Sequence, residues 1–309
     1  MKKFKNILYV SHGLKSHSDS IGQALRLSHN NNAPVQGLLF CPSLPSNLSE
    51  YQASYENSLV HSVNQQIQES RSVHDINEES VPFPLDVVCG ENPAVDVIQA
   101  VQNASHDLVI KDAEPIDGKG FKAIDMTLLR KCPSAVWLNR LTHQPTSKRR
   151  IAVAVDPMIT DDEHKALSLR LLELSSSIAH SCGSRLHLLS CWEHQLERYL
   201  QDHAWIKIEE GELDKEIEAA KQTHREALDH LVTESGISGD IVVHHLHGEP
   251  DELIPDWVDE HEIDVLVMGT LARTGIPGIV IGNTAENIVQ AVSCSLVALK
   301  PPGFVSPVR

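Results

Sequence analysis

The chain has 309 residues, of which 41% are hydrophobic and 22% are charged, a composition typical of a globular protein with about two domains. Its formal net charge of −16 opposes binding to nucleic acid or to an anionic membrane surface. Its aromatic content of 4% argues against platforms on which single-stranded bases stack. No apolar run approaches the ~18 residues of a membrane-spanning helix, and no signal-peptide pattern precedes the first strand. We therefore expect a cytoplasmic protein that neither binds nucleic acid nor spans a membrane.

Several short β-branched runs alternate with helical patterns along the first half of the chain. The strand-like runs include residues 6–10, 106–110 and 132–137. A turn with the sequence Gly-Glu-Asn-Pro at residues 90–93 opens an amphipathic helix, and proline suits the first helical turn because it has no N–H to leave unpaired. The polar segment 141–150, which contains Pro145, is the expected linker.

The second half repeats this plan in the same order. Residues 151–155, 263–267 and 294–299 match the three runs named above, and Gly248-Glu249-Pro250 repeats the helix-opening turn. The match sets Asp264 opposite Asp107, Cys294 opposite Cys132 and Asp156 opposite Ser11. Residues 192–235 form a longer middle segment in which apolar side chains recur at helical spacing, as in a helix that packs one face on a sheet.

Apolar strands that alternate with helices predict parallel sheets covered on both faces. The fold class is therefore α/β, with two tandem doubly wound domains over residues 1–146 and 147–309. Each domain should hold a five-stranded parallel sheet, and an approximate two-fold axis should relate the two. The final strands, around Ala135 and Val297, should lie near the interface.

The six cysteines form no C-x-x-C pair, and most lie within or beside apolar, strand-like runs. This placement is typical of buried, reduced thiols.

Residues 269–287 form a glycine-containing loop between a strand at 264–268 and a helix at 284–292. In an open α/β sheet, ligands bind at the carboxyl ends of strands, where helix N-termini present free N–H groups. Arg273 adds a cation suited to a phosphate. A structural interpretation stays open, because Asn283 and Glu286 have the spacing of a capping box and Asp156 suits a turn. The chain has no Walker A loop and no G-x-G-x-x-G fingerprint.

This loop resembles that of the universal stress protein family, in which Gly-x-x-Gly is followed nine residues later by Gly-Ser or Gly-Thr. Here Gly269 is the first glycine, Ala272 holds the second position, and Gly282-Asn283 is the closing pair. The resemblance covers the whole chain, once per half. Tandem members of the family have sequences similar to the Arg-Thr-Gly and Gly-Asn-Thr-Ala-Glu of the second half and to residues 128–134.

The resemblance implies an adenine-nucleotide α-hydrolase-like fold and a nucleotide site in the second half. The residues that correspond to the nucleotide site of ATP-binding members are Asp156, Met268, Gly269, Gly282, Asn283 and Thr284. Ala272 and Arg273 of the same loop complete the candidate site.

Two departures from the family pattern weaken this site. The methyl group of Ala272 penalises a left-handed backbone by about 1–2 kcal/mol, and Asn283 replaces a hydroxyl that would contact phosphate. The first half departs further, because it has Ser11 in place of an acidic residue and a shorter loop that keeps only Gly118 and Gly120. We expect that the first half has lost nucleotide binding and that the second binds ATP weakly or not at all.

The histidines at 244, 245 and 247 suggest a metal site. Strand alternation puts His245 and His247 on one face, where His187 of a second strand could approach them. No carboxylate or thiol at matching spacing completes a zinc site, so we expect no metal. Ser11 beside His12 lacks the positioned third group of a catalytic triad, and so do Ser190 and Cys191 near His194.

The sequence therefore predicts a non-catalytic stress-response protein that acts through protein or small-ligand binding. Its two halves should pack on each other as subunits do in single-domain relatives, while a homodimer and an unidentified protein partner stay open. The alternative is an ATP-binding switch, with or without slow hydrolysis, that uses the second half. An enzyme that borrows the fold would need a titratable cluster near Gly269, where the sequence offers only Asp156 and Arg273.

Overall fold

The computed structural model describes residues 4–13, 19–142, 144–159, 161–194, 197, 211–270 and 281–308. The strands of the first half are β1 (Ile7–Ser11), β2 (Val35–Cys41), β3 (Leu85–Cys89), β4 (Leu108–Asp112) and β5 (Ala135–Asn139). Its helices are α1 (Ser20–Asn31), η1 (Ser46–Tyr51), α2 (Gln52–His74), α3 (Pro93–Ala104) and α4 (Ala123–Lys131). The second half has strands β6 (Ile151–Ala154), β7 (Leu186–Trp192), β8 (Ile241–His247), β9 (Val265–Gly269) and β10 (Ser295–Leu299). Its helices are η2 (Thr146–Lys148), α5 (Asp162–Ser181), α7 (Glu212–Ser235), α8 (Pro250–Glu260) and α9 (Asn283–Ala291).

The described strands form one ten-stranded sheet in the order β3-β2-β1-β4-β5-β10-β9-β6-β7-β8. Strands within each half run parallel, and β5 pairs with β10 in the antiparallel direction at the centre, where Trp137 lies opposite Val297. The strand order of the second half mirrors that of the first. This arrangement confirms two five-stranded parallel sheets related by an approximate two-fold axis, with the final strands at the interface.

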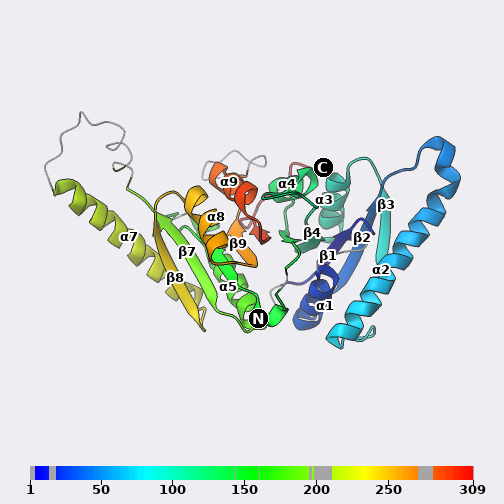
Figure 1. Cartoon of the computed structure of the whole chain (residues 1–309), viewed down its shortest axis with the longest axis horizontal. Coiled ribbons are helices and arrows are strands. Elements are labelled where there is room, and N and C mark those ends of the chain that lie inside the picture. The colour runs from blue at the N-terminus through cyan, green and yellow to red at the C-terminus, as the bar shows by residue number, and fades with distance from the viewer. Residues whose placement is uncertain are drawn as a thin grey trace.

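Helices cover both faces of the sheet (Figure 1), because its strands are apolar on both sides. Side chains alternate along β1, so that Ile7 and Tyr9 join one hydrophobic core and Leu8 and Val10 the other. The first core also takes in α1, α2, α5 and α7, and the second takes in α3, α4, α8 and α9. Each core extends through both halves, so the two halves share their packing.

The helix starts agree with the sequence. Pro93 and Pro250 occupy the first helical turns of α3 and α8. Gly248, before α8, has a φ of +131°, a conformation that L side chains rarely adopt. The long helix α7 buries His224, Leu228 and Leu231, which confirms that it packs one face on its sheet.

Strand register corrects one match between the halves. Ile7 begins β1 and pairs with the first residue of β4, while Ile151 begins β6 and pairs with the first residue of β9. Ile7 and Ile151 are therefore equivalent, and His12 rather than Ser11 occupies the position of Asp156. The sequence match was one residue out because a strand buried on both faces has no polar alternation to mark its register.

A second match is wrong by two residues. Ala135 and Ser295 are the first paired residues of β5 and β10, so Cys132 and Cys294 are not equivalent. Ten residues separate β4 from α4 and thirteen separate β9 from α9. The loop of the first half is therefore three residues shorter than that of the second. The match of Cys132 with Cys294 had indicated a larger difference in loop length.

The segment between the halves is fixed to the second sheet. The Arg150 backbone N–H donates to Asp264 Oδ2 at 2.8 Å, and the Thr142 hydroxyl donates to the other carboxylate oxygen of Asp264 at 2.5 Å. A domain boundary between residues 146 and 147 stays a prediction.

The expectation of reduced thiols is wrong for two cysteines. Cys41 and Cys89 end the neighbouring strands β2 and β3, are paired in register, and form a disulfide with a Cα–Cα distance of 4.9 Å. The two cysteines are 48 residues apart in the chain and have no C-x-x-C spacing, because the sheet rather than the local sequence brings them together. Cys132, Cys182 and Cys294 are buried free thiols.

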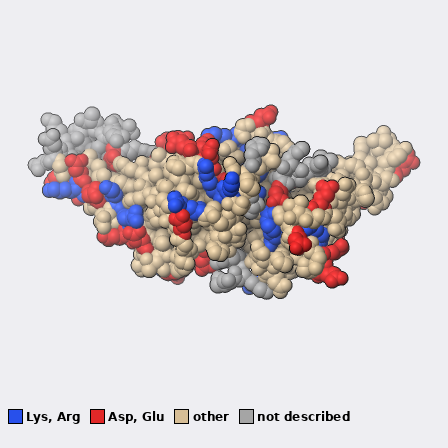
Figure 2. Space-filling model, turned by 60° about the horizontal axis from the view of Figure 1, so that its bottom comes forward, with Lys and Arg blue, Asp and Glu red and all other residues tan. Residues whose placement is uncertain are grey.

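Basic and acidic side chains are interspersed on one face of the molecule (Figure 2). On the face shown in Figure 2, Lys and Arg side chains lie among Asp and Glu side chains and do not form a continuous basic stripe. In the part of the chain that the structure describes, no helix is long and apolar enough to cross a membrane.

Candidate functional site

The second-half site lies at the carboxyl ends of β6 and β9, which are adjacent and parallel. Asp156 follows β6, and its Oδ1 accepts the backbone N–H of Met158 at 2.9 Å. This contact is the turn-forming role that the sequence left open. The residue is half-buried. Its carboxylate therefore stabilises the turn at the position where a contact with a ligand was expected.

Met268 and Gly269 end β9 but do not present polar side chains. Met268 is 4% exposed and belongs to the core beneath α8 and α9. A Cβ atom at Gly269 would lie 2.9 Å from Leu167 Cδ2 of α5, so a larger residue there would displace the Leu167 side chain. These two residues could therefore contact a ligand only through their backbone.

The N-terminus of α9 is the part of the site best suited to an anion. Gly282 is its N-cap and makes no side-chain capping bond, while Asn283 and Thr284 are exposed. The predicted capping box is wrong, because Asn283 is already helical and Glu286 pairs with Arg130 of α4. The first-turn N–H groups of an α-helix have no partner within the helix and favour anions. Ala272 and Arg273 lie outside the described residues.

A buried lysine that the sequence analysis missed lies behind the start of this loop. Lys300 is 5% exposed, and its Nζ donates to Thr270 Oγ1 at 2.9 Å and to the carbonyl oxygen of Leu129 in the first half. Burial lowers the pKa of Lys300 to about 8. The sequence signal was a lysine directly after the last strand. Arg140 holds the same position after β5, and its backbone N–H donates to Ser295 Oγ at 3.0 Å.

The corresponding edge of the first half is filled by an ion pair. Lys111 Nζ lies 2.8 Å from Asp125 Oδ1, and both side chains are at most 2% exposed. The other carboxylate oxygen of Asp125 accepts the backbone N–H of Glu114 at 2.8 Å. A carboxylate of the chain itself thus accepts from a lysine donor and a backbone donor at this edge.

The second half has uncharged residues at the equivalent positions. Strand register sets Met268 opposite Lys111, and equal helix lengths set Ala285 opposite Asp125. Both Met268 and Ala285 belong to the hydrophobic core. The two halves therefore share a fold but differ at this edge in charge and in hydrogen bonding.

The histidines form two contact groups on opposite faces of the sheet. On the face of α8, His187 Nδ1 lies 3.0 Å from His244 Nε2, and both rings lie near Trp257. On the face of α7, His224 Nδ1 lies 2.9 Å from His245 Nε2.

The expectation that His187 approaches His245 and His247 is therefore wrong. His187 pairs with Val242 in register, so it shares a face with His244 two residues on. Among the described residues, the candidate metal-binding cluster of three or more ligands contains none of these histidines.

A pocket of about 210 Å³ lies between α5 and α7, where Asp156 meets Lys165, Ser168 and Glu234. Lys165 Nζ is already paired with Glu234 Oε1 at 2.8 Å. The volume is below the ~300–1,000 Å³ typical of small-molecule sites. This pocket therefore suits a fragment of a ligand better than a whole nucleotide.

A tandem, doubly wound α/β architecture with a helix N-terminus at the carboxyl edge defines a nucleotide-binding-like class of fold. The model of the universal stress protein family matches residues 148–300. The chain is 32% identical over 238 residues to universal stress protein E of Escherichia coli K12. The aligned region covers 74% of this chain and 72% of that protein. The chain belongs to the universal stress protein family.

Two further comparisons cover almost the entire chain. A universal stress protein E homolog of Haemophilus influenzae is 28% identical over 97% of this chain and 98% of its own. The crystal structure of a functionally unknown protein from Pseudomonas aeruginosa PAO1 has a TM-score of 0.72 at 23% identity, and covers 97% of this chain and 94% of its own. The tandem arrangement is therefore found in a solved structure.

The ion pair of the first half gives a test of the asymmetry. Asp125→Ala should lower the free energy of unfolding by about 3–5 kcal/mol, because it leaves Lys111 charged and buried without its partner. Adding Lys111→Met copies the Met/Ala pair of the second half and should recover most of this loss. Urea unfolding of both variants measures the difference. A double variant as unstable as Asp125→Ala alone would show that the two halves do not have equivalent packing at this edge.

The histidine groups predict acid sensitivity of the second half. Burial lowers the pKa of His187, His224 and His245 from 6.5, and that of His244 to about 4. Between these values and 6.5 the unfolded chain binds more protons than the folded one. Stability should therefore be complete above about pH 6.5 and should fall as the pH drops toward about 4.

Thermal unfolding between pH 7.5 and 4.5 measures this effect. His244→Leu should reduce the slope of Tm against pH, while His29→Gln, on the exposed last turn of α1, should leave it unchanged. An equal slope in wild type and His244→Leu would contradict the assignment.

Proposed function

We propose that this chain is a non-catalytic, cytoplasmic stress-response protein whose first half is a structural partner and whose second half binds a small ligand or a protein. The observation that carries this proposal is the difference between the two carboxyl edges. The Lys111–Asp125 pair fills the first edge, whereas the equivalent positions of the second edge hold the uncharged Met268 and Ala285.

The contacts of the serines considered as nucleophiles favour binding over catalysis. The Ser190 hydroxyl donates to the carbonyl oxygen of Val155 at 2.9 Å, and Ser11 Oγ accepts the backbone N–H of Gly13 at 3.1 Å. The Ser11 hydroxyl thus stabilises the turn after β1, and the Ser190 hydroxyl, within β7, holds the residue that follows β6. A nucleophile needs instead a contact with a positioned base.

The second candidate function is an ATP-binding switch that uses the second half. It is favoured by the N-terminus of α9, where Gly282 makes no side-chain cap and where an anion would gain from the helix dipole. It is opposed by Ala272 and Asn283, the departures from the family loop. Each departure costs on the order of 1 kcal/mol, and the net charge of −16 costs a similar amount for a polyanion. The three terms together leave a site about a hundred times weaker than a micromolar one.

Calorimetric titration with ATP distinguishes the two candidates. The unmodified protein should bind with a Kd of roughly 100 μM or weaker. Ala272→Gly combined with Asn283→Ser should strengthen binding by about tenfold or more, because it restores the second glycine and the hydroxyl of the family pattern. Ala123→Ser, at the first-half position equivalent to Asn283, is the matched control and should change nothing.

Micromolar binding by the unmodified protein, or nucleotide carried through purification, would put the switch first. Equal, weak binding by the unmodified and the restored protein would contradict the switch, and would leave the second edge either to another ligand or as a relic of the fold.

A further inference from the structure

The Cys41–Cys89 pair lies at the outer edge of the first half. Cys41 is the last residue of β2 and Cys89 the last residue of β3, and they are register partners on parallel strands. Their Cα atoms are 4.9 Å apart, within the ~4.4–6.8 Å range of disulfides. The backbone of the sheet therefore holds the two sulfur atoms within bonding reach, with no movement of either strand required.

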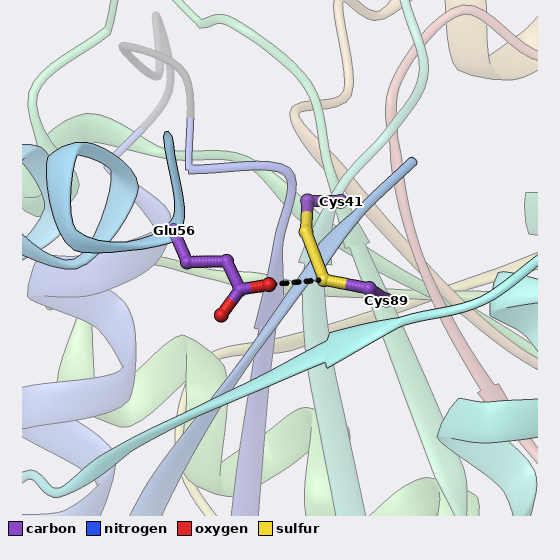
Figure 3. A group of neighbouring side chains, drawn as sticks. All are labelled: Cys41, Glu56 and Cys89. Atoms are coloured by element: carbon purple, nitrogen blue, oxygen red, sulfur yellow. Dashed lines mark hydrogen bonds between the residues drawn. A yellow bond between two sulfur atoms is a disulfide. The ribbon is translucent and has the colours of Figure 1, made fainter. Parts of the chain in front are cut away.

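Two polar side chains of α2 point at this pair. The Gln52 amide nitrogen donates to Cys89 Sγ at 3.1 Å and lies 3.7 Å from Cys41 Sγ. Its oxygen accepts the Leu44 backbone N–H at 2.8 Å, which fixes the orientation of the amide. Glu56 Oε1 lies 3.1 Å from Cys89 Sγ, and Figure 3 shows the Glu56 carboxylate pointing at that sulfur. An amide N–H stabilises a thiolate and a carboxylate can take the proton of a thiol, so the pair has the neighbours that thiol chemistry needs.

The other cysteines lack these features. Burial raises the pKa of Cys132 to about 11 and those of Cys191 and Cys294 to about 12. Cys41 is 3% exposed and Cys89 is half-buried, so a small reagent can reach Cys89 first.

The pair is also particular to the first half. Strand register sets Trp192 and His247 at the equivalent positions of β7 and β8, and their rings stack with centroids 4.3 Å apart. The shared fold therefore does not require cysteines at this point.

We propose that Cys41 and Cys89 are a reversible thiol–disulfide site that hydroperoxides oxidise and small dithiols reduce. This proposal is independent of the ligand edge of the second half. It gives the first half, whose own ligand edge is filled, a role in responding to an oxidant.

The chemistry balances with the peroxide as oxidant. Glu56 takes the proton of Cys89, and the thiolate attacks one peroxide oxygen. The O–O bond breaks, an alcohol or water leaves with a proton, and Cys89 becomes a sulfenic acid. The Cys41 thiolate then attacks the Cys89 sulfur, the S–O bond breaks, and water leaves as the disulfide forms. The two sulfurs lose two electrons in total to the peroxide, and a dithiol returns them with two protons.

The bond should change the stability of the first half. It closes a loop between residues 48 apart in sequence, which contains η1 and the whole of α2. Closing a loop of this size restricts the unfolded chain, and a rise in Tm of about 5–10 °C is expected on oxidation.

Thiol titration of the reduced full-length protein tests the proposal. After one equivalent of hydrogen peroxide, the six thiols of the chain should fall to four, and peptide mapping should find Cys41 linked to Cys89. Dithiothreitol should restore all six. Six remaining thiols, or loss confined to other cysteines, would overturn the proposal.

Variants separate the roles of the residues. Cys191→Ser is the matched control and should lose the same two thiols and show the same rise in Tm. Cys41→Ser should instead leave a Cys89 sulfenic acid that dimedone traps, with no rise in Tm. Glu56→Gln should slow oxidation by about tenfold or more. If Cys41→Ser fails to fold, Cys89→Ser gives the second test, because its remaining Cys41 should stay unmodified under the same treatment.

A zinc site is the rival outcome, because Cys41, Glu56 and Cys89 have ligand atoms within 4.8 Å of one another and are ligand types that zinc accepts. The reduced protein is therefore also incubated with Zn²⁺ alone before peroxide is added. Uptake of one ion per chain that blocks oxidation would overturn the redox proposal in favour of a metal site. Oxidation at the same rate with and without Zn²⁺ would support it.

Discussion

The antiparallel pairing of β5 with β10 is the contact on which the rest of the structure depends. It joins two parallel sheets into one and gives each final strand a partner on the side that would otherwise be an open edge. It also sets the carboxyl edges of the two halves at opposite ends of the strands. Each carboxyl edge consequently lies beside the amino edge of the other half.

This geometry places polar contacts between the two halves at both carboxyl edges. The Gly120 backbone N–H, from the loop before α4, donates to the carbonyl oxygen of Val292 at the end of α9. In the opposite direction, Lys300 reaches from behind the second-half loop to the carbonyl oxygen of Leu129. Each half thus contacts the other at a carboxyl edge through a backbone carbonyl oxygen.

Much of the fold could be predicted from the sequence, because order and type of elements follow from local pattern. The repeated apolar runs identified the strands, and Pro93 and Pro250 identified the helix starts. Register could not be predicted, because a strand that is apolar on both faces has no polar alternation to show which residues share a face. For this reason Ser11 was matched with Asp156, although His12 is the equivalent residue. Contacts between residues distant in sequence could not be predicted for a related reason. The Cys41–Cys89 bond, the His187–His244 contact and the Lys111–Asp125 pair all depend on strand order and register.

At the candidate site, the sequence indicated the right edge but not the role of each residue. Gly269 and Gly282 were expected to approach phosphate, yet Gly269 makes room for Leu167 of α5. Met268 faces the core, so its membership in the site rests on backbone position alone. The asymmetry between Met268 with Ala285 and Lys111 with Asp125 became visible only once the sheet set the two halves in register.

Hydrogen–deuterium exchange with millimolar ATP, read peptide by peptide, tests the central claim that only the second edge is open to a ligand. Slower exchange is expected only in peptides that contain Asp156 or residues 282–284, and peptides around Lys111 and Asp125 should exchange at the same rate with and without ATP. Protection around Lys111 and Asp125 would contradict the claim, because it would show that the internal ion pair does not close the first half to an anionic ligand.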